Sequence, residues 1–138
     1  MNTTELPVAE SMPYWKTSKS GVETWLDKTE KLIESVKGNV HTRINGKSNG
    51  KEAIMIGFRI SNDEFKLLWP VLKTKNEKDK AAAQRQAATA IFHDTKARVG
   101  RIRVFGPKVT FFDYLVLSDG RSVAEVGGIT DVTKLLRS

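Results

Sequence analysis

Cations concentrated in one third of the chain are the residues whose chemistry points to a function. Residues 66–108 hold eleven Lys and Arg against three acids, while residues 1–65 are balanced and residues 109–138 carry one excess acid. A local excess of this kind creates a positive potential that attracts polyanions. We expect seven of these side chains to contact phosphates: Lys75, Lys78, Lys80, Arg85, Lys96, Arg101 and Arg103.

Phosphate contacts of this kind imply a nucleic acid, DNA or RNA, as the partner. Cations displace the counterions condensed on the phosphate backbone, so the affinity would fall steeply with salt. Gln84 and Gln86 are the side chains in this region that could read base edges. Binding of a single strand would need aromatic rings on the basic surface, but the periodic positions of Trp69, Phe92 and Phe105 assign these rings to the core. The plain alternative is a lysine-rich helix whose charge serves only solubility.

A long helix and a short strand are the elements expected to hold these cations. The alanine-rich segment 75–99 favours a helix. At about 100° per residue, three polar side chains then fall within about 20° of the direction of Lys78: Arg85, Thr89 and Lys96. Basic and apolar residues alternate over 101–105, which predicts a short basic strand that Gly106–Pro107 ends.

The sequence offers little for enzymatic chemistry. It has no cysteine, and its two histidines, His41 and His93, lie in no metal-binding spacing. It also lacks a glycine-rich phosphate loop, and no serine has a base placed beside it. We therefore expect a non-enzymatic protein that holds neither a metal nor a cofactor.

One catalytic alternative is a metal-dependent nuclease. Glu64–Phe65–Lys66 has an E-x-K form in which the carboxylate would bind a cation and the lysine would steady the nucleophile. Glu52, across the hairpin, would supply the second carboxylate. A different alternative is a protein-interaction or adaptor domain, possible as a homodimer, that uses Tyr14–Trp15 or the apolar segment 111–117 to meet an acidic protein partner.

The rest of the chain reads as a flexible leader over 1–19 followed by a single α+β domain over 20–138. Ser20 and Glu23 form a capping-box pattern that begins an N-terminal helix, and Gly38–Asn39 stops it. Alternating apolar residues then predict a three-stranded antiparallel meander. Its strands are 40–45, 52–60 and 65–69, and the long second helix follows.

The sequence is compatible with two structures for the C-terminal part. Asp119–Gly120 between two apolar runs favours a hairpin, while the crowded run 111–117 is equally typical of a buried helical turn. A last short helix is expected from Thr130 or Asp131 to Leu136.

This order of helix, three strands and helix is similar to that of the double-stranded-RNA-binding domain. Residues 78–88, where Lys78 and Lys80 precede a run of alanines, resemble the start of the second helix of that family. The resemblance covers about half the chain. The glycine-rich approach and the adjacent basic pair that precede this helix in the family are missing here.

Length and composition bound these alternatives. The chain has 138 residues, of which 39% are hydrophobic and 28% charged, with a net charge of +7. These values are typical of one globular domain and exclude wholesale disorder. No apolar run approaches the roughly 18 residues that a membrane span requires, and the first ten residues lack the pattern of a secretory signal. We expect a cytoplasmic protein.

Overall fold

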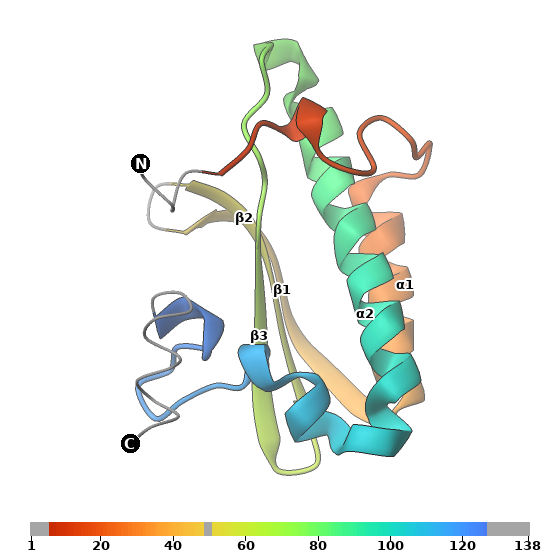
Figure 1. Cartoon of the computed structure of the whole chain (residues 1–138), viewed down its shortest axis with the longest axis vertical. Coiled ribbons are helices and arrows are strands. Elements are labelled where there is room, and N and C mark those ends of the chain that lie inside the picture. The colour runs from red at the N-terminus through yellow and green to blue at the C-terminus, as the bar shows by residue number, and fades with distance from the viewer. Residues whose placement is uncertain (1–5, 49–50, 127–138) are drawn as a thin grey trace.

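The computed structural model describes residues 6–48 and 51–126. It confirms the α+β class, since an N-terminal helix, a three-stranded antiparallel sheet and a long second helix follow one another along the chain. The two helices lie side by side over one face of the sheet (Figure 1). The elements are α1 (Val22–Ser35), β1 (Gly38–Ser48), β2 (Lys51–Ile60), β3 (Asp63–Pro70) and α2 (Lys80–Thr110), with one-turn 3-10 segments η1 (Ala9–Ser11), η2 (Glu77–Asp79), η3 (Phe112–Tyr114) and η4 (Ala124–Val126).

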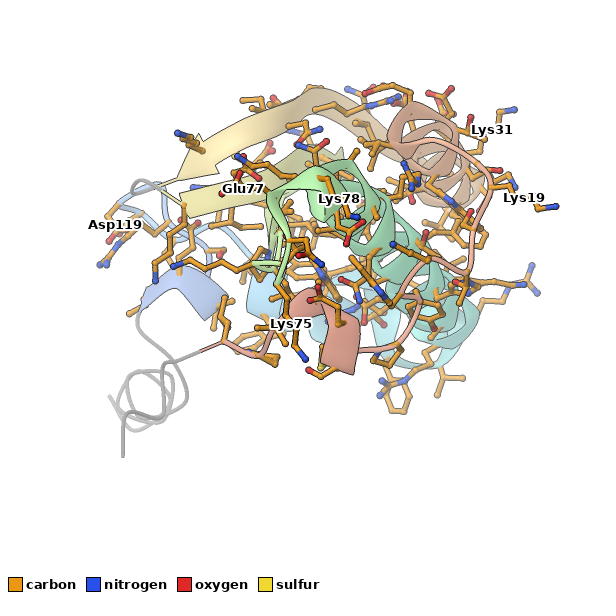
Figure 2. All side chains as sticks on the ribbon, turned by 90° about the horizontal axis from the view of Figure 1, so that it is seen from above. Lys19, Lys31, Lys75, Glu77, Lys78 and Asp119 are labelled. Carbon is orange, nitrogen blue, oxygen red and sulfur yellow. The ribbon has the colours of Figure 1, made fainter. Side chains whose placement is uncertain are left out.

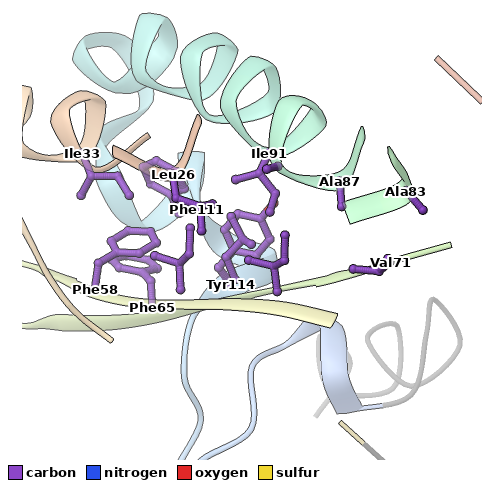
Figure 3. Packing of buried hydrophobic residues seen from close by; sticks show 14 of the residues in the cluster. Leu26, Ile33, Phe58, Phe65, Val71, Ala83, Ala87, Ile91, Phe111 and Tyr114 are labelled. Atoms are coloured by element: carbon purple, nitrogen blue, oxygen red, sulfur yellow. The ribbon is translucent and has the colours of Figure 1, made fainter. Parts of the chain in front are cut away.

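The core lies between the sheet and the two helices. The strand order is β1-β2-β3, and Phe58 of β2 pairs with Phe65 of β3. Their rings stack with centroids 5.3 Å apart, and Phe111 meets the Phe58 ring edge-on at 5.3 Å. Figure 3 shows these three rings beneath Leu26 and Ile33 of α1. The alternating apolar residues of β2 therefore form the floor of the core, as their period of two predicts.

The start of α1 differs from the capping box expected at Ser20. The N-cap residue is Gly21, and it has no side chain that could cap the helix. The hydroxyl of Ser18 instead accepts hydrogen bonds from the backbone N–H of Ser20 and the indole N–H of Trp25, at 3.1 and 2.8 Å. The helix entry is thus held by a serine that precedes the expected motif.

The junction of α1 with β1 uses Gly38 for a reason other than backbone freedom. Lys37 takes the left-handed conformation, with φ of 66°. Gly38 lies so close to α1 that a Cβ atom there would sit 2.9 Å from the carbonyl oxygen of Ile33 and against its side chain. The close approach of helix and strand therefore requires glycine at position 38.

The expected strand over 101–105 is wrong, because α2 continues through these residues to Thr110. Val99 and Ile102, three residues apart on the helix, both pack against the core cluster, which favours the helical period over the alternating one. Gly106, with φ of 77°, and Pro107 then kink the helix. No helix in the described ranges is long and apolar enough to cross a membrane.

Both structures considered for the C-terminal part occur, one after the other. Residues 112–114 form the helical turn η3, and a small hairpin follows, in which Val116 bridges to Ser122. Gly120, with φ of 85°, makes its turn. The hairpin joins the edge of β3, where the N–H of Val116 donates to the carbonyl of Glu64, and η4 lies on the side of the sheet away from the helices (Figure 1). The helix expected over 130–136 lies outside the described residues.

The described part of the N-terminal segment, from residue 6, packs along the upper half of α2 (Figure 1). Ala9 is fully buried, and its N–H donates to the carbonyl of Lys73 at 2.8 Å. The Gln86 amide nitrogen lies 2.8–3.3 Å from the carbonyl oxygens of Ala9, Met12 and Pro13. Tyr14 stacks on His93 and Trp15 packs against the core cluster, so this aromatic pair lies on the domain.

Two glycine substitutions should have opposite effects on stability. Gly38→Ala should lower the free energy of unfolding by about 1–3 kcal/mol, because the new methyl group meets Ile33 and forces α1 and β1 apart. Gly100→Ala is the matched control. It lies inside α2 with nothing within 4 Å of its added Cβ, so it should raise the free energy by about 0.5–1 kcal/mol. Urea denaturation measures both, and equal effects would contradict the close-approach argument.

Candidate nucleic-acid interface

Three of the seven expected phosphate contacts share one side of α2. Arg85, Lys96 and Arg103 are separated by eleven and then seven residues, which places them within about 20° of one another around the helix. Lys96 and Arg103 are exposed and Arg85 is half-buried. We call these three side chains the α2 basic face.

This face differs from the expected stripe in two members. Lys78 lies in η2, before α2 begins, and Thr89 is buried with its hydroxyl bonded to the carbonyl of Arg85. Arg103 joins the face because residues 101–105 continue the helix. Because these residues form a helix and not the expected strand, the candidate interface gains Arg103.

Three further expected residues gather where α2 begins. Lys80 is committed to the protein itself, since its ammonium lies 2.9 Å from Glu52 of β2, whose hydrogen bond raises the pKa of Lys80. Lys75 and Lys78 are exposed at this end of the molecule, and in the view from above Lys78 lies near Glu77 whereas Lys75 lies beside η1 (Figure 2). Lys51 precedes Glu52 in the chain and adds a cation to this end. The start of α2 is therefore a second basic group, separate from the α2 basic face.

Arg101 lies apart from both groups. Five residues separate it from Lys96, so it points to the side of α2 about 140° away. Its guanidinium lies over the ring of Phe105, 5.1 Å from the ring centre. Phe105 is 49% exposed and Val104 is 77% exposed. The core position expected for Phe105 is therefore wrong, because the alternating pattern that suggested it belongs to a strand that does not form.

The α2 basic face keeps its charge because nearby acids are paired with other bases. Asp94 is the one acid within α2, and its Oδ2 accepts hydrogen bonds from Arg98 at 2.8 Å and from the Tyr114 hydroxyl at 2.9 Å. Asp113 receives both terminal nitrogens of Arg98, and Asp63 lies 3.6 Å from Lys108. Within residues 6–48 and 51–126, the three members of the face form no ion pair with a carboxylate.

Arg98 is a structural cation rather than part of the interface. Burial disfavours its charged form, but the hydrogen bonds and charges of Asp113 and Asp94 outweigh burial and raise the pKa of Arg98 above its ordinary value. Its guanidinium also stacks on the Tyr114 ring at 4.2 Å. Burial, reinforced by the charge of Asp94, raises the pKa of Tyr114 as well.

The two carboxylates of the nuclease alternative lie too far apart to share a cation. Glu52 stands near the start of β2, whereas Glu64 pairs with Arg59 near its end, so seven strand residues, about 23 Å, separate the two positions. Glu52 binds Lys80, and Glu64 binds His41 and Arg59. No cluster of three potential metal ligands occurs in the part of the chain that the structure describes.

His41 reaches Glu64 because of a bulge and a glycine. The register of β1 shifts between Val40 and Thr42, and the His41 ring lies against Gly57 of the central strand, where a Cβ would sit 2.9 Å from it. The other ring nitrogen lies 2.8 Å from the Thr42 hydroxyl. These contacts cross-link the three strands, which gives His41 and Glu64 a structural role.

Sequence reasoning missed a cavity of about 380 Å³ between the N-terminal segment, the end of β3 and α2. Tyr14, Trp69 and His93 line it together with small residues of α2. The one available signal was the aromatic pair Tyr14–Trp15, because two large rings in a polar segment call for a surface to pack on.

Comparison of the chain with known protein families, with curated proteins and with solved structures finds no match. The resemblance of residues 78–88 to the double-stranded-RNA-binding domain therefore stays a prediction.

The Tyr114 hydroxyl should make stability fall at alkaline pH. Its pKa is raised in the folded state, so above about pH 10 the unfolded chain loses this proton while the folded chain keeps it, and the free energy of unfolding falls by about 1.4 kcal/mol per pH unit. Tyr114→Phe should lower stability at neutral pH by about 1 kcal/mol, through the lost bond to Asp94, and should remove this part of the alkaline slope. Identical slopes for both proteins in urea titrations from about pH 8 to 11 would refute the assignment.

Proposed function

We propose that this protein is a non-enzymatic nucleic-acid-binding protein that contacts phosphates through the α2 basic face. The observation that carries the proposal is that Arg85, Lys96 and Arg103 align on one side of α2 without a carboxylate partner among the described residues. Cations that serve only the fold are paired here, as Lys80 and Arg98 are. Unpaired, aligned cations are those that can release counterions from a phosphate backbone.

The dimensions of the face suit an extended polyanion. Arg85 and Arg103 are eighteen residues apart, or about 27 Å along the helix axis. Gly100, which adds no side chain, lies between Lys96 and Arg103 on nearly the same side, so a phosphate backbone can approach the helix closely there. Lys75 and Lys78 add charge at the start of α2.

Neutralising the face should weaken nucleic-acid binding in a salt-dependent way. For the triple variant Arg85→Gln, Lys96→Gln and Arg103→Gln, the slope of log affinity against log salt should become shallower by about 2 to 3, since three phosphate contacts are lost. Fluorescence anisotropy of labelled duplex and single-stranded DNA and RNA at about 50 to 200 mM salt measures this slope.

The control is a second triple variant with the same change in net charge, placed on the strands and the α1–β1 junction: Lys37→Gln, Lys47→Gln and Arg59→Gln. It should keep the wild-type slope. Equal weakening by both variants would mean that net charge alone governs binding. Absence of binding by the wild-type protein to all four nucleic acids at low salt would overturn the proposal.

A protein-interaction function is the second candidate, and one observation favours it. Four large apolar residues at the end of α2 and just beyond it are exposed to solvent: Val104, Phe105, Val109 and Phe112. The surfaces first expected for such a partner are less suited, because Tyr14 stacks on His93 and both Phe111 and Tyr114 are buried. Sedimentation of the wild-type protein and of the double variant Val104→Ser with Val109→Ser tests this candidate. If the protein self-associates through these residues, the mass of the assembly falls in the double variant, whereas a protein that does not self-associate keeps the same mass.

A further inference from the structure

The cavity beside α2 has the size and lining of a site for a small planar ligand. Its volume is about 380 Å³, and ligand pockets begin at roughly 300 Å³. Apolar and aromatic residues dominate its walls, with few polar groups among them. The residues used below are Tyr14, Trp69, Ala90, His93 and Asp94.

The wall formed by the N-terminal segment is held in place by several independent contacts. Gln86 binds three carbonyls of this segment, Lys16 pairs with Asp79 at 3.0 Å, and the Glu10 carboxylate accepts the N–H of Lys75 at 2.8 Å. Tyr14 takes a left-handed conformation, with φ of 69°, that lays its ring on His93 at 4.9 Å and 11°. A strained tyrosine held in this way indicates a preformed surface rather than a mobile tail.

Asp94 provides the polar group that orients a ligand. Its Oδ2 is occupied by Arg98 and Tyr114, while Oδ1 receives no hydrogen bond from the described residues. A carboxylate oxygen at the edge of aromatic walls accepts N–H donors from a flat ring. It also repels phosphate, so a ligand with a phosphate must place that group outside the cavity.

Resting on the proposed function, we infer that this cavity takes one unstacked base of a single-stranded nucleic acid and prefers guanine. Single-stranded bases are bound by stacking on Tyr, Trp or His rings and by hydrogen bonds to their Watson–Crick edge. Guanine presents two adjacent donors on that edge, N1–H and N2–H, toward Asp94. The other bases present one donor group on that edge. Guanine therefore fits the available Oδ1 of Asp94 best.

The strand leaves the cavity along α2 toward Arg101. Ala90 and Ala97 are seven residues apart on one side of the helix and leave a path free of large side chains. Arg101 lies seven residues beyond Asp94, about 10 Å along the axis, where its guanidinium covers the exposed Phe105 ring. A cation and a ring at this distance can receive the next phosphate and base.

A leucine placed in the cavity tests this inference. Ala90→Leu fills the space between Tyr14 and Trp69, while Ala81→Leu adds the same group at an exposed position of α2, outside the residues that line the cavity and away from the path toward Arg101. Anisotropy is measured with labelled oligothymidine and with the same oligomer carrying one central guanine. The wild type and Ala81→Leu should bind the guanine oligomer about fivefold or more tighter, and Ala90→Leu should lose that preference while it binds duplex DNA unchanged.

The outcomes separate this inference from the proposed function. If all three proteins bind both oligomers equally, the cavity inference is overturned and phosphate binding by the α2 basic face stands. If no nucleic acid binds, guanosine monophosphate alone is titrated into ¹⁵N-labelled protein. Shifts at Trp69 and His93 that Ala90→Leu abolishes support the cavity, and their absence overturns it. Should Ala90→Leu fail to fold by circular dichroism, Trp69→Leu replaces it, since it removes the stacking ring and keeps apolar volume.

Discussion

The end of α2 and the closing of the core depend on one interaction, the pairing of the mostly buried Arg98 with Asp94 and Asp113. The Arg98 side chain is only 18% exposed, and a charge so placed is tolerated only when carboxylates and carbonyls satisfy it. Asp94 lies one turn earlier on the same helix, but Asp113 and the carbonyl of Thr110 come from beyond or at the helix end. The chain must therefore turn back after Thr110. That reversal lays Phe111 on the Phe58 and Phe65 rings.

The same pairing divides the cations of the protein into two populations. The first population consists of bases that form ion pairs within the fold. Arg43 of β1 pairs with three acids of α1, which are Glu23, Asp27 and Glu30. Arg98 pairs with Asp94 and Asp113. The charges of these acids are balanced by the bases that they bind, so they do little to offset the remaining positive charge. Arg101 and the three members of the α2 basic face, Arg85, Lys96 and Arg103, are the cations of α2 that no carboxylate of the described residues pairs with. An even count of acids and bases in the N-terminal half of the chain thus coexists with a positive surface over α2.

Local patterns predicted most of the fold, and long-range contacts account for what they missed. The alternation of Ile54, Ile56 and Phe58 identifies β2 because a buried face repeats every two residues. The pattern over 101–105 fits a strand equally well on its own, and only packing of Val99 and Ile102 on the core decides for a helix. For the site, nothing near Lys80 in the sequence indicates that Glu52 binds it. The cavity depends on Gln86 and the N-terminal segment meeting in space, for which no local pattern exists.

The contact between Gln86 and Ala9 spans 77 positions of the chain, and this separation has a consequence for biosynthesis. The segment that supplies one wall of the cavity is made before the sheet, but the helix residue that holds it emerges from the ribosome only after all three strands. Until then the carbonyl of Ala9 lacks the Gln86 amide and Tyr14 lacks the His93 ring. Closing so long a loop carries an entropic cost that an already formed helix and sheet must offset. The N-terminal segment is therefore among the last parts of the described chain to dock.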